Sequence, residues 1–260
     1  MWWSKKKNVS GDQEQTLLTH LTELRDRLLR AICFILILFL ALSPFANAIY
    51  TTIAEPLLAQ LPDNGRMIAT EVAAPFLVPF KLTFFVSLFI SMPYLLYQSW
   101  AFIAPGLYEN ERRFALPLVL ISTVLFYLGT CFAFFVIFPI IFKFFALSAP
   151  EGVTFVPDIG HYLTFVLKLF FAFGVAFEVP IITIMLVKTG LTSVKTLSAK
   201  RSYIIVGAFT AGMLMTPPDV ASQVLLATPI WLLFELGLLM CKYFVSDSDE
   251  LEEQETDSPS

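Results

Sequence analysis

Glu178 lies in a long apolar run, within FGVAFEVP at residues 173–180, and no side chain in that stretch could pair with it. A carboxylate inside such a segment is costly to bury, so it usually faces a cavity or a binding partner. Lys168 is ten residues earlier, on a different helical face, which excludes a simple ion pair within one helix. Pro180 frees the carbonyl group of Ala176 and predicts a kink there. The pattern favours a functional carboxylate, with a protonated glutamate bonded inside a helix bundle as the alternative.

Two further carboxylates, Glu23 and Glu111, lie beside arginines in the stretches HLTELRDRLLR and YENERR. If both reach the cytosolic surface, each could bind one guanidinium group through forked hydrogen bonds, a geometry that an ammonium group cannot match. For Glu23, the alternative is an ion pair with Arg27, one turn further along an interfacial helix. For Glu111, which precedes Arg112 and Arg113, the alternative is a solvated loop of mixed charge.

A third polar stretch, MTPPDVASQ, separates the last two apolar blocks. Pro217 and Pro218 are expected to end one helix, and Asp219 to cap the next. The amide group of Gln223, one turn further on, could bond a neighbouring helix.

Several catalytic motifs are absent. Without a Gly-Lys pair there is no phosphate loop of the Walker type, so ATP hydrolysis by that route is excluded. The aspartates lie in tails or connections, H-E-x-x-H is missing, and the three cysteines have no C-x-x-C spacing. We therefore expect no enzyme, cofactor or metal site, which leaves transport, recognition or scaffolding.

The composition is that of a membrane protein, because 57% of the 260 residues are hydrophobic, only 15% are charged, and 27 are phenylalanines. The apolar residues form five blocks of spanning length, at about 28–48, 76–98, 114–138, 162–187 and 224–241. A shorter block at 203–215 is doubtful as an isolated span, and its Gly207 and Ala211 predict close approach of another helix.

Charge predicts the orientation and the ends of the domain. Most lysines and arginines lie before the first block or in the loops after the second and fourth, which predicts a cytoplasmic N-terminus. The polar stretch before the first block is long and partly acidic, so we interpret that block as a retained helix, not a signal peptide. We expect a flexible tail at 1–16, a transmembrane domain at 17–245, and a disordered acidic tail at 246–260.

Six stretches occur in the order HLTELRDRLL, AEPLLAQLP, WAFIAPGLYENERR, FGVAFEVP, RSYIIVGAF and GMLMTPPDVASQ. With these motifs, over about residues 15–245, the chain resembles the TatC family, the core membrane subunit of the bacterial twin-arginine protein translocase. Glu55 precedes Pro56 where a small residue is usual in the family.

The resemblance implies an all-α membrane protein with six transmembrane helices in a rigid cupped bundle, the fifth and sixth short. It implies a bacterial inner membrane location, with both termini cytoplasmic and the proton-motive force as energy source. The implied partners are single-span TatA-like and TatB-like subunits, twin-arginine signal peptides of folded cargo, other copies of the chain and the lipid bilayer, with no nucleic acid.

The same resemblance implies roles for individual residues. The signal-peptide site includes Glu23, Arg25, Glu109, Glu111 and Arg112, although an acid at 109 departs from the family pattern. Glu178 matches a glutamate in the concave groove, where water, partner helices or the peptide would surround it. Partner-subunit contact falls on Met213, Thr216 and Gln223. Structural roles fall on Pro56, Pro217, Pro218 and Asp219.

A rival hypothesis is a proton-coupled transporter of small solutes, in which Glu178 carries the proton. Deep ionisable residues and proline-broken helices suggest it. The sequence has no internal repeat of the kind that many transporter folds show, which counts against it.

Overall fold

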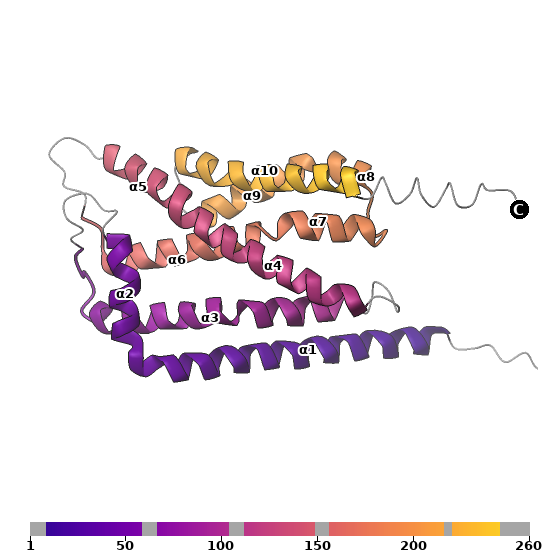
Figure 1. The fold of residues 1–260 in the computed structure, drawn as a ribbon, viewed down its shortest axis with the longest axis horizontal. Coiled ribbons are helices and arrows are strands. Elements are labelled where there is room, and N and C mark those ends of the chain that lie inside the picture. The colour runs from indigo at the N-terminus through magenta and orange to yellow at the C-terminus, as the bar shows by residue number, and fades with distance from the viewer. Residues whose placement is uncertain (1–8, 59–66, 104–111, 149–155, 216–219, 245–260) are drawn as a thin grey trace, which may run out of the picture. The chain divides into compact units, whose positions relative to one another are not determined.

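The computed structural model describes residues 9–58, 67–103, 112–148, 156–215 and 220–244, and the regular structure in these ranges is helical (Figure 1). The one β-type contact found there is an isolated bridge between Ile68 and Asp158. The helices are α1 (Val9–Leu42), α2 (Ala46–Leu58), α3 (Ala74–Ile103), α4 (Arg112–Phe132), α5 (Phe138–Leu147), α6 (Ile159–Ala176), α7 (Val179–Lys188), α8 (Val194–Ala199), α9 (Arg201–Met215) and α10 (Val220–Phe244). A 3-10 turn (Ser43–Phe45) joins α1 to α2, and a π-helical segment (Ala133–Ile137) joins α4 to α5.

Five helical segments are long and apolar enough to cross a membrane, which confirms the five predicted spans. They are Leu21–Ile53, Ala74–Phe102, Leu116–Phe145, Ile159–Lys188 and Gln223–Tyr243. The sixth apolar helix, Arg201–Met215, is shorter, as the doubtful block predicted. At ~1.5 Å per residue its 15 residues reach roughly 22 Å, less than the ~30 Å of hydrocarbon in a bilayer.

The bounds of the transmembrane domain at 17–245 stay a prediction. Helix α1 begins at Val9, inside the segment 1–16 that we expected to be a flexible tail. The acidic tail at 246–260 lies outside the described residues. Pro56 lies in α2, although its side chain is likewise outside the described part of the chain.

The chain divides into two compact units, and the first comprises residues 1–44 and 83–120. In this unit, α1 contacts α3 through aromatic pairs, with ring centroids 4.6 Å apart for Phe34 and Tyr94 and 5.9 Å apart for Phe39 and Phe84. Buried serines of α3 donate hydrogen bonds to carbonyl groups one turn earlier in the same helix. The apolar span therefore satisfies its own polar side chains.

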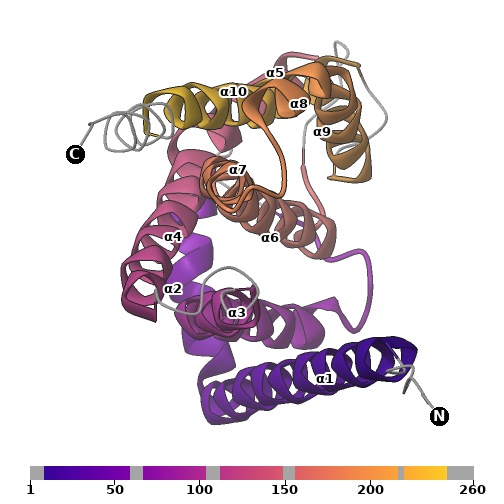
Figure 2. The same cartoon turned by 90° about the vertical axis from the view of Figure 1, so that its right-hand side faces the viewer.

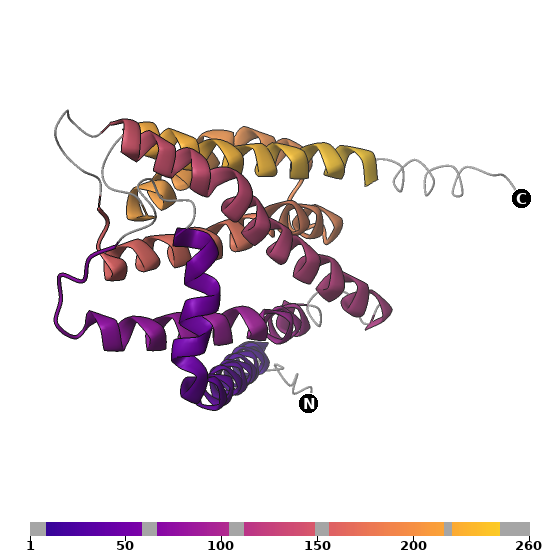
Figure 3. The same ribbon diagram turned by 60° about the vertical axis from the view of Figure 1, so that its left-hand side comes forward.

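The second unit comprises residues 45–82 and 121–260 and contains the main hydrophobic core. The run from α4 through the π-helical segment into α5 is continuous (Figure 3). Buried aromatic rings from this run and from α6 form much of the core, with Phe126, Phe138 and Phe173 at most 1% exposed. Helix α10 packs against both α7 and α9.

Glycines allow the helices of the second unit to approach closely. A Cβ atom at Gly129 of α4 would overlap the backbone carbonyl oxygen of Phe173 on α6, and one at Gly174 would overlap the Phe126 ring. A Cβ atom at Gly237 of α10 would lie 3.0 Å from Cα of Pro180 on α7. Small residues at such crossings let the helix backbones approach closely, and the resulting van der Waals contacts hold membrane helices together where no hydrophobic effect acts between them.

The predicted helix contact at Gly207 and Ala211 is wrong in its position. Gly207 is exposed, and a Cβ atom there would meet nothing within 4 Å. The buried face of α9 is formed by Ala208 and Gly212, and a Cβ atom at Gly212 would lie 3.5 Å from the carbonyl oxygen of Gln223 on α10. The spacing of small residues was correct, but the sequence could not choose between two adjacent registers.

Gly129→Ala should destabilise the protein by about 1–3 kcal/mol, because the added methyl group meets backbone that cannot rotate away. Gly207→Ala, in open space on another helix, is the matched control and should cost nothing measurable. Thermal unfolding in detergent checks both variants. Equal melting temperatures for the two would contradict the close α4–α6 crossing.

Candidate functional site

Glu23 is held in an ion pair within its own helix, in the first unit. Arg27, one turn further along α1, donates to Oε1 of Glu23 from Nη2 at 2.6 Å and from Nε at 2.9 Å. Arg27 also donates from Nη1 to Oε1 of Gln98 on α3, at 3.3 Å. The predicted i, i+4 pair is therefore confirmed. Oε2 of Glu23 has no hydrogen bond among the described residues, and the side chain is 37% exposed.

The other residues of the predicted peptide site are only partly described. Glu109 and Glu111 lie outside the described residues, and so does the side chain of Arg112, where α4 begins. Arg25 pairs with its neighbour Asp26, with Nη2 and Nε at 2.8 and 2.9 Å from Oδ1, and both side chains are exposed. Whether Glu23 and Glu111 share one surface stays a prediction.

Glu178 marks an interruption between α6 and α7, where Pro180 predicted a kink (Figure 2). Its backbone N–H donates to the carbonyl group of Val175 at 3.0 Å, and its own carbonyl group accepts from the N–H of Ile182 at 2.9 Å. The chain thus leaves one helix and enters the next with hydrogen bonds on both sides of Glu178. This arrangement places the carboxylate at a helix junction, as its sequence context indicated.

The side chain of Glu178 is only 6% exposed, which differs from the expected open groove. Neither carboxylate oxygen has a hydrogen bond of good geometry among the described residues, although Ser122 of α4 lies near enough to interact. The close contact of Gly237 with Pro180 packs α10 onto the start of α7 and helps to explain the burial. A buried carboxyl group without donors gains free energy from any donor that reaches it.

The predicted partner-contact residues lie where α9 and α10 meet. Met213 is 61% exposed on α9, and Gln223 is partly buried on α10, with its backbone beside Gly212. Thr216, Pro217, Pro218 and Asp219 lie outside the described residues. A pocket of about 150 Å³ is lined by Ile205, Ala208, Phe209, Ala227, Thr228 and Trp231 of the same two helices.

An ion pair that the sequence analysis missed ties α9 to α10. Arg201 donates to Glu235 in a forked geometry, with Nε 2.7 Å from Oε1 and Nη2 2.8 Å from Oε2. Glu235 is the one acidic residue of the last apolar block. Like Glu178, an acid in an apolar segment indicates a specific partner, so the sequence did contain a signal for this contact. The pair fixes the start of the short helix against α10.

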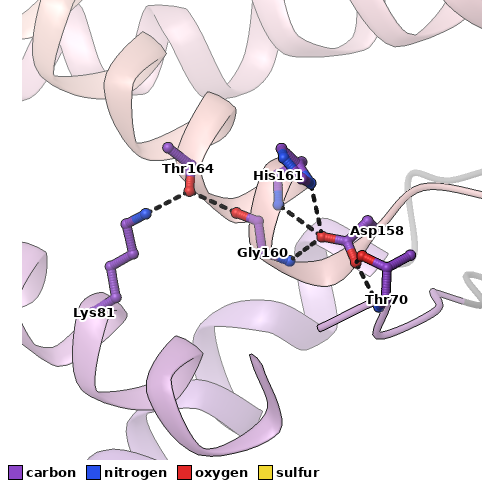
Figure 4. A network of polar contacts seen from close by, with 6 residues as sticks. All are labelled: Thr70, Lys81, Asp158, Gly160, His161 and Thr164. Carbon is purple, nitrogen blue, oxygen red and sulfur yellow. Dashed lines mark hydrogen bonds and ion pairs between the residues drawn. The ribbon is translucent and has the colours of Figure 1, made fainter. Parts of the chain in front are cut away.

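A polar network around Asp158, also missed, fixes the start of α6 (Figure 4). Oδ1 of Asp158 accepts from the backbone N–H groups of Gly160 and His161, and Oδ2 accepts from the N–H and the hydroxyl group of Thr70. Hydrogen bonds from Thr70, followed by those from His161, hold the pKa of this carboxyl group well below its usual range. The segment before α3 is thereby joined to the start of α6.

The described residues contain no group of three or more His, Cys, Asp or Glu that could hold a metal ion. Two ion pairs between charged groups position helices, and the carboxyl group of Glu178 is a buried acidic group in none of the ion pairs of the described residues. A multi-span helical protein with such a group is suited to binding a membrane-inserted partner.

The family model described as "Sec-independent protein translocase protein (TatC)" matches residues 19–229. The chain belongs to the TatC family. It is 56% identical to the TatC of Haemophilus influenzae over 92% of this chain and 93% of that protein. It is 52% identical to the TatC of Escherichia coli K12 over 94% of this chain and 95% of the relative.

A solved structure described as "Crystal Structure of Twin Arginine Translocase Receptor- TatC" is similar with a TM-score of 0.78 and 38% identity. The similarity covers 86% of this chain and 98% of that one. TatC membership and the similar crystal structure confirm the predicted family and the all-α, multi-pass membrane fold. A TatC protein is a component of a protein translocase and not a catalytic enzyme.

Asp158→Ala should lower the thermal stability of the protein at neutral pH, because the start of α6 and Thr70 lose their shared acceptor. The folded-state pKa is depressed, so the stabilisation is complete above the ordinary aspartate pKa of about 3.9 and is lost as the pH falls below it. The difference in melting temperature between wild type and variant should shrink below about pH 4. Asp26→Ala, at an exposed pair on α1, is the control. A pH-independent difference for Asp158→Ala would refute this account.

Proposed function

We propose that this TatC-family protein is the receptor and scaffold subunit of a twin-arginine translocation system in a bacterial inner membrane. It binds twin-arginine signal peptides at the cytosolic face through Glu23 and Glu111, and assembles with TatA-like and TatB-like subunits and with further copies of itself. It exports folded proteins with the proton-motive force as energy source. The family membership supports the translocase role, and the distribution of lysines and arginines supports cytoplasmic termini.

The observation that carries the receptor role is the state of Glu23. Arg27 holds Oε1 of this carboxylate, which fixes the orientation of the side chain and leaves Oε2 for a donor from outside. Arg27 already offsets the charge of Glu23, so Oε2 can accept hydrogen bonds from one further guanidinium group, but this carboxylate cannot balance two more positive charges. A peptide with two adjacent arginines therefore needs a second carboxylate, and Glu111 provides it.

The charged residues near Glu23 and Glu111 in the sequence set the net charge of the proposed peptide site. Arg112 follows Glu111 directly, and Arg25 is neutralised by Asp26. Glu109 adds negative charge to the same loop and offsets the arginines that follow. A cationic signal would thus meet one acid, Glu23, that Arg27 already orients, together with the acids of the loop at 109 and 111.

Glu178 serves the next step, in which the signal peptide enters the membrane more deeply. Its buried carboxyl group has no hydrogen bond of good geometry in the described part of the chain, apart from the nearby hydroxyl group of Ser122, so a polar group of an inserted peptide or a partner helix would stabilise it further. Contact with the single-span partner subunits is assigned to Met213, Thr216 and Gln223. The exposure of Met213 on the short helix α9 supports this assignment.

The burial of Glu178 also supports a second candidate function, a proton-coupled transporter of small solutes. A desolvated carboxyl group at a broken helix is suited to taking up and releasing a proton. Membership of a protein translocase family favours the first proposal.

Binding of a signal peptide with paired arginines should be tighter than binding of its paired-lysine version, because only arginine makes the forked contact. Glu111→Ala should weaken the paired-arginine peptide roughly ten- to hundredfold, by removal of one charge-assisted pair worth ~1.5–3 kcal/mol, with the fold intact. Fluorescence anisotropy with purified protein measures both effects. Glu71→Ala, at an exposed acid before α3, is the control and should change nothing. Equal affinities for the two peptides would reject forked recognition.

Glu178→Gln should leave peptide capture at the surface intact and impair deep insertion, because the amide keeps the shape but changes the hydrogen-bonding groups. Photo-crosslinking from the hydrophobic segment of the peptide measures insertion, and anisotropy on the same sample measures capture. Unchanged crosslinking would remove Glu178 from the insertion step. Loss of solute uptake with normal crosslinking would favour the transporter.

A further inference from the structure

Among the exposed lysines inside apolar spans of the second unit, one lies on α3 and one on α6. Lys81 belongs to the span Ala74–Phe102 and Lys168 to the span Ile159–Lys188. Nζ of Lys81 donates to the hydroxyl group of Thr164 on α6 at 2.7 Å (Figure 4). No hydrogen bond or ion pair is found for Lys168 within the described ranges. An exposed ammonium group in a membrane span is costly unless it reaches polar surroundings or an anion.

The two lysines lie on the same face of the α3–α6 pair. On α6, His161, Thr164 and Lys168 follow one another at spacings of three and four, while Leu163, Val166 and Leu169 on the opposite side are at most 1% exposed. Thr164 and Lys168, one turn apart, have Cβ atoms about 5–6 Å from each other. Lys81 donates to Thr164, so both lysines belong to the face of the α3–α6 pair on which Thr164 lies.

Both lysines also lie near the same membrane surface. The backbone hydrogen bonds between Ile68 and the residues flanking Asp158 join the segments that precede α3 and α6, so the two helices begin at one level. At ~1.5 Å per residue, Lys81 is roughly 10 Å and Lys168 roughly 14 Å below the starts of their helices. Helical side chains lean towards the N-terminus, so both ammonium groups extend towards that surface.

No ion pair joins Lys81 or Lys168 to an acidic group among the described residues. Asp158 is the acidic residue at the start of α6, and both of its oxygens already accept hydrogen bonds from Thr70, Gly160 and His161. The hydroxyl group of Thr164 donates to the carbonyl group of Gly160, so it offers Lys81 an acceptor but no negative charge. Each ammonium group keeps donors for a further ligand, because it has three.

We propose that Lys81, Thr164 and Lys168 form a binding site for the phosphate group of an anionic phospholipid, in the leaflet that the starts of α3 and α6 reach. Val175, exposed on the same face of α6 two turns deeper than Lys168, suits an acyl chain. Two ammonium groups that extend from within the spans towards the headgroups suit a phosphate diester. The alternative ligand is a carboxylate on a partner helix. Burying that carboxylate inside the membrane costs free energy, whereas the phosphate group of a lipid already lies at the membrane surface.

The test compares binding of phosphatidylglycerol and phosphatidylcholine to the purified full-length protein by native mass spectrometry. Wild type should prefer phosphatidylglycerol by roughly tenfold or more, since each lysine near a membrane surface strengthens binding of anionic lipid. Lys168→Met, which leaves the Lys81–Thr164 hydrogen bond intact, should lose most of this preference, and Lys168→Arg should retain it.

Lys143→Met is the matched control, because Lys143 is an exposed lysine within the span Leu116–Phe145 and outside the proposed site. It should leave the preference for phosphatidylglycerol unchanged. Equal binding of the two lipids to wild type would overturn the proposal, as would an equal loss in the Lys143 and Lys168 variants. Melting temperatures without added lipid establish that each variant is folded, and an unfolded Lys168→Met is replaced by Lys168→Gln.

Discussion

Hydrocarbon offers no hydrogen bonds to a peptide group, and this constraint governs how every polar group in these spans is arranged. The backbone is helical through each span, and hydroxyl groups such as those of Ser87 and Thr183 bond to carbonyl groups of their own helices. Where Pro180 removes a backbone donor, the chain bonds on both sides of Glu178 and continues as a second helix. In the described part of the chain, the buried polar atoms without a hydrogen bond of good geometry are the carboxylate oxygens of Glu178 and Nε1 of Trp231.

The spans and the break at Pro180 could be predicted from sequence because both depend on local properties, the length of apolar runs and the missing N–H of proline. The packing register of α9 could not. Gly207 and Ala211 have the same spacing as Ala208 and Gly212, and only the position of α10 decides which pair is buried. The burial of Glu178 depends on the same kind of information, the contact of Gly237 with Pro180.

The polar contacts that were missed join residues far apart in sequence. Asp158 meets Thr70, and Glu235 meets Arg201, and neither spacing carries a pattern that a single sequence reveals. The Glu23–Arg27 pair was anticipated because i, i+4 contacts follow from helix geometry alone. At the proposed peptide site, the ion pair that orients Glu23 could be predicted from the sequence, but the distance between Glu23 and Glu111 could not.

The π-helical segment at Ala133–Ile137 changes the direction in which the side chains of α5 point relative to those of α4. The N–H of Phe138 reaches back five residues to the carbonyl group of Ala133, so this turn accommodates one residue more than an ordinary one. The extra residue rotates everything that follows by roughly a quarter turn relative to an uninterrupted helix, at about 100° per residue. The buried faces of α4 and α5 can therefore point in different directions along one continuous helix. At Pro180 the chain instead changes its buried face by ending α6 and starting α7.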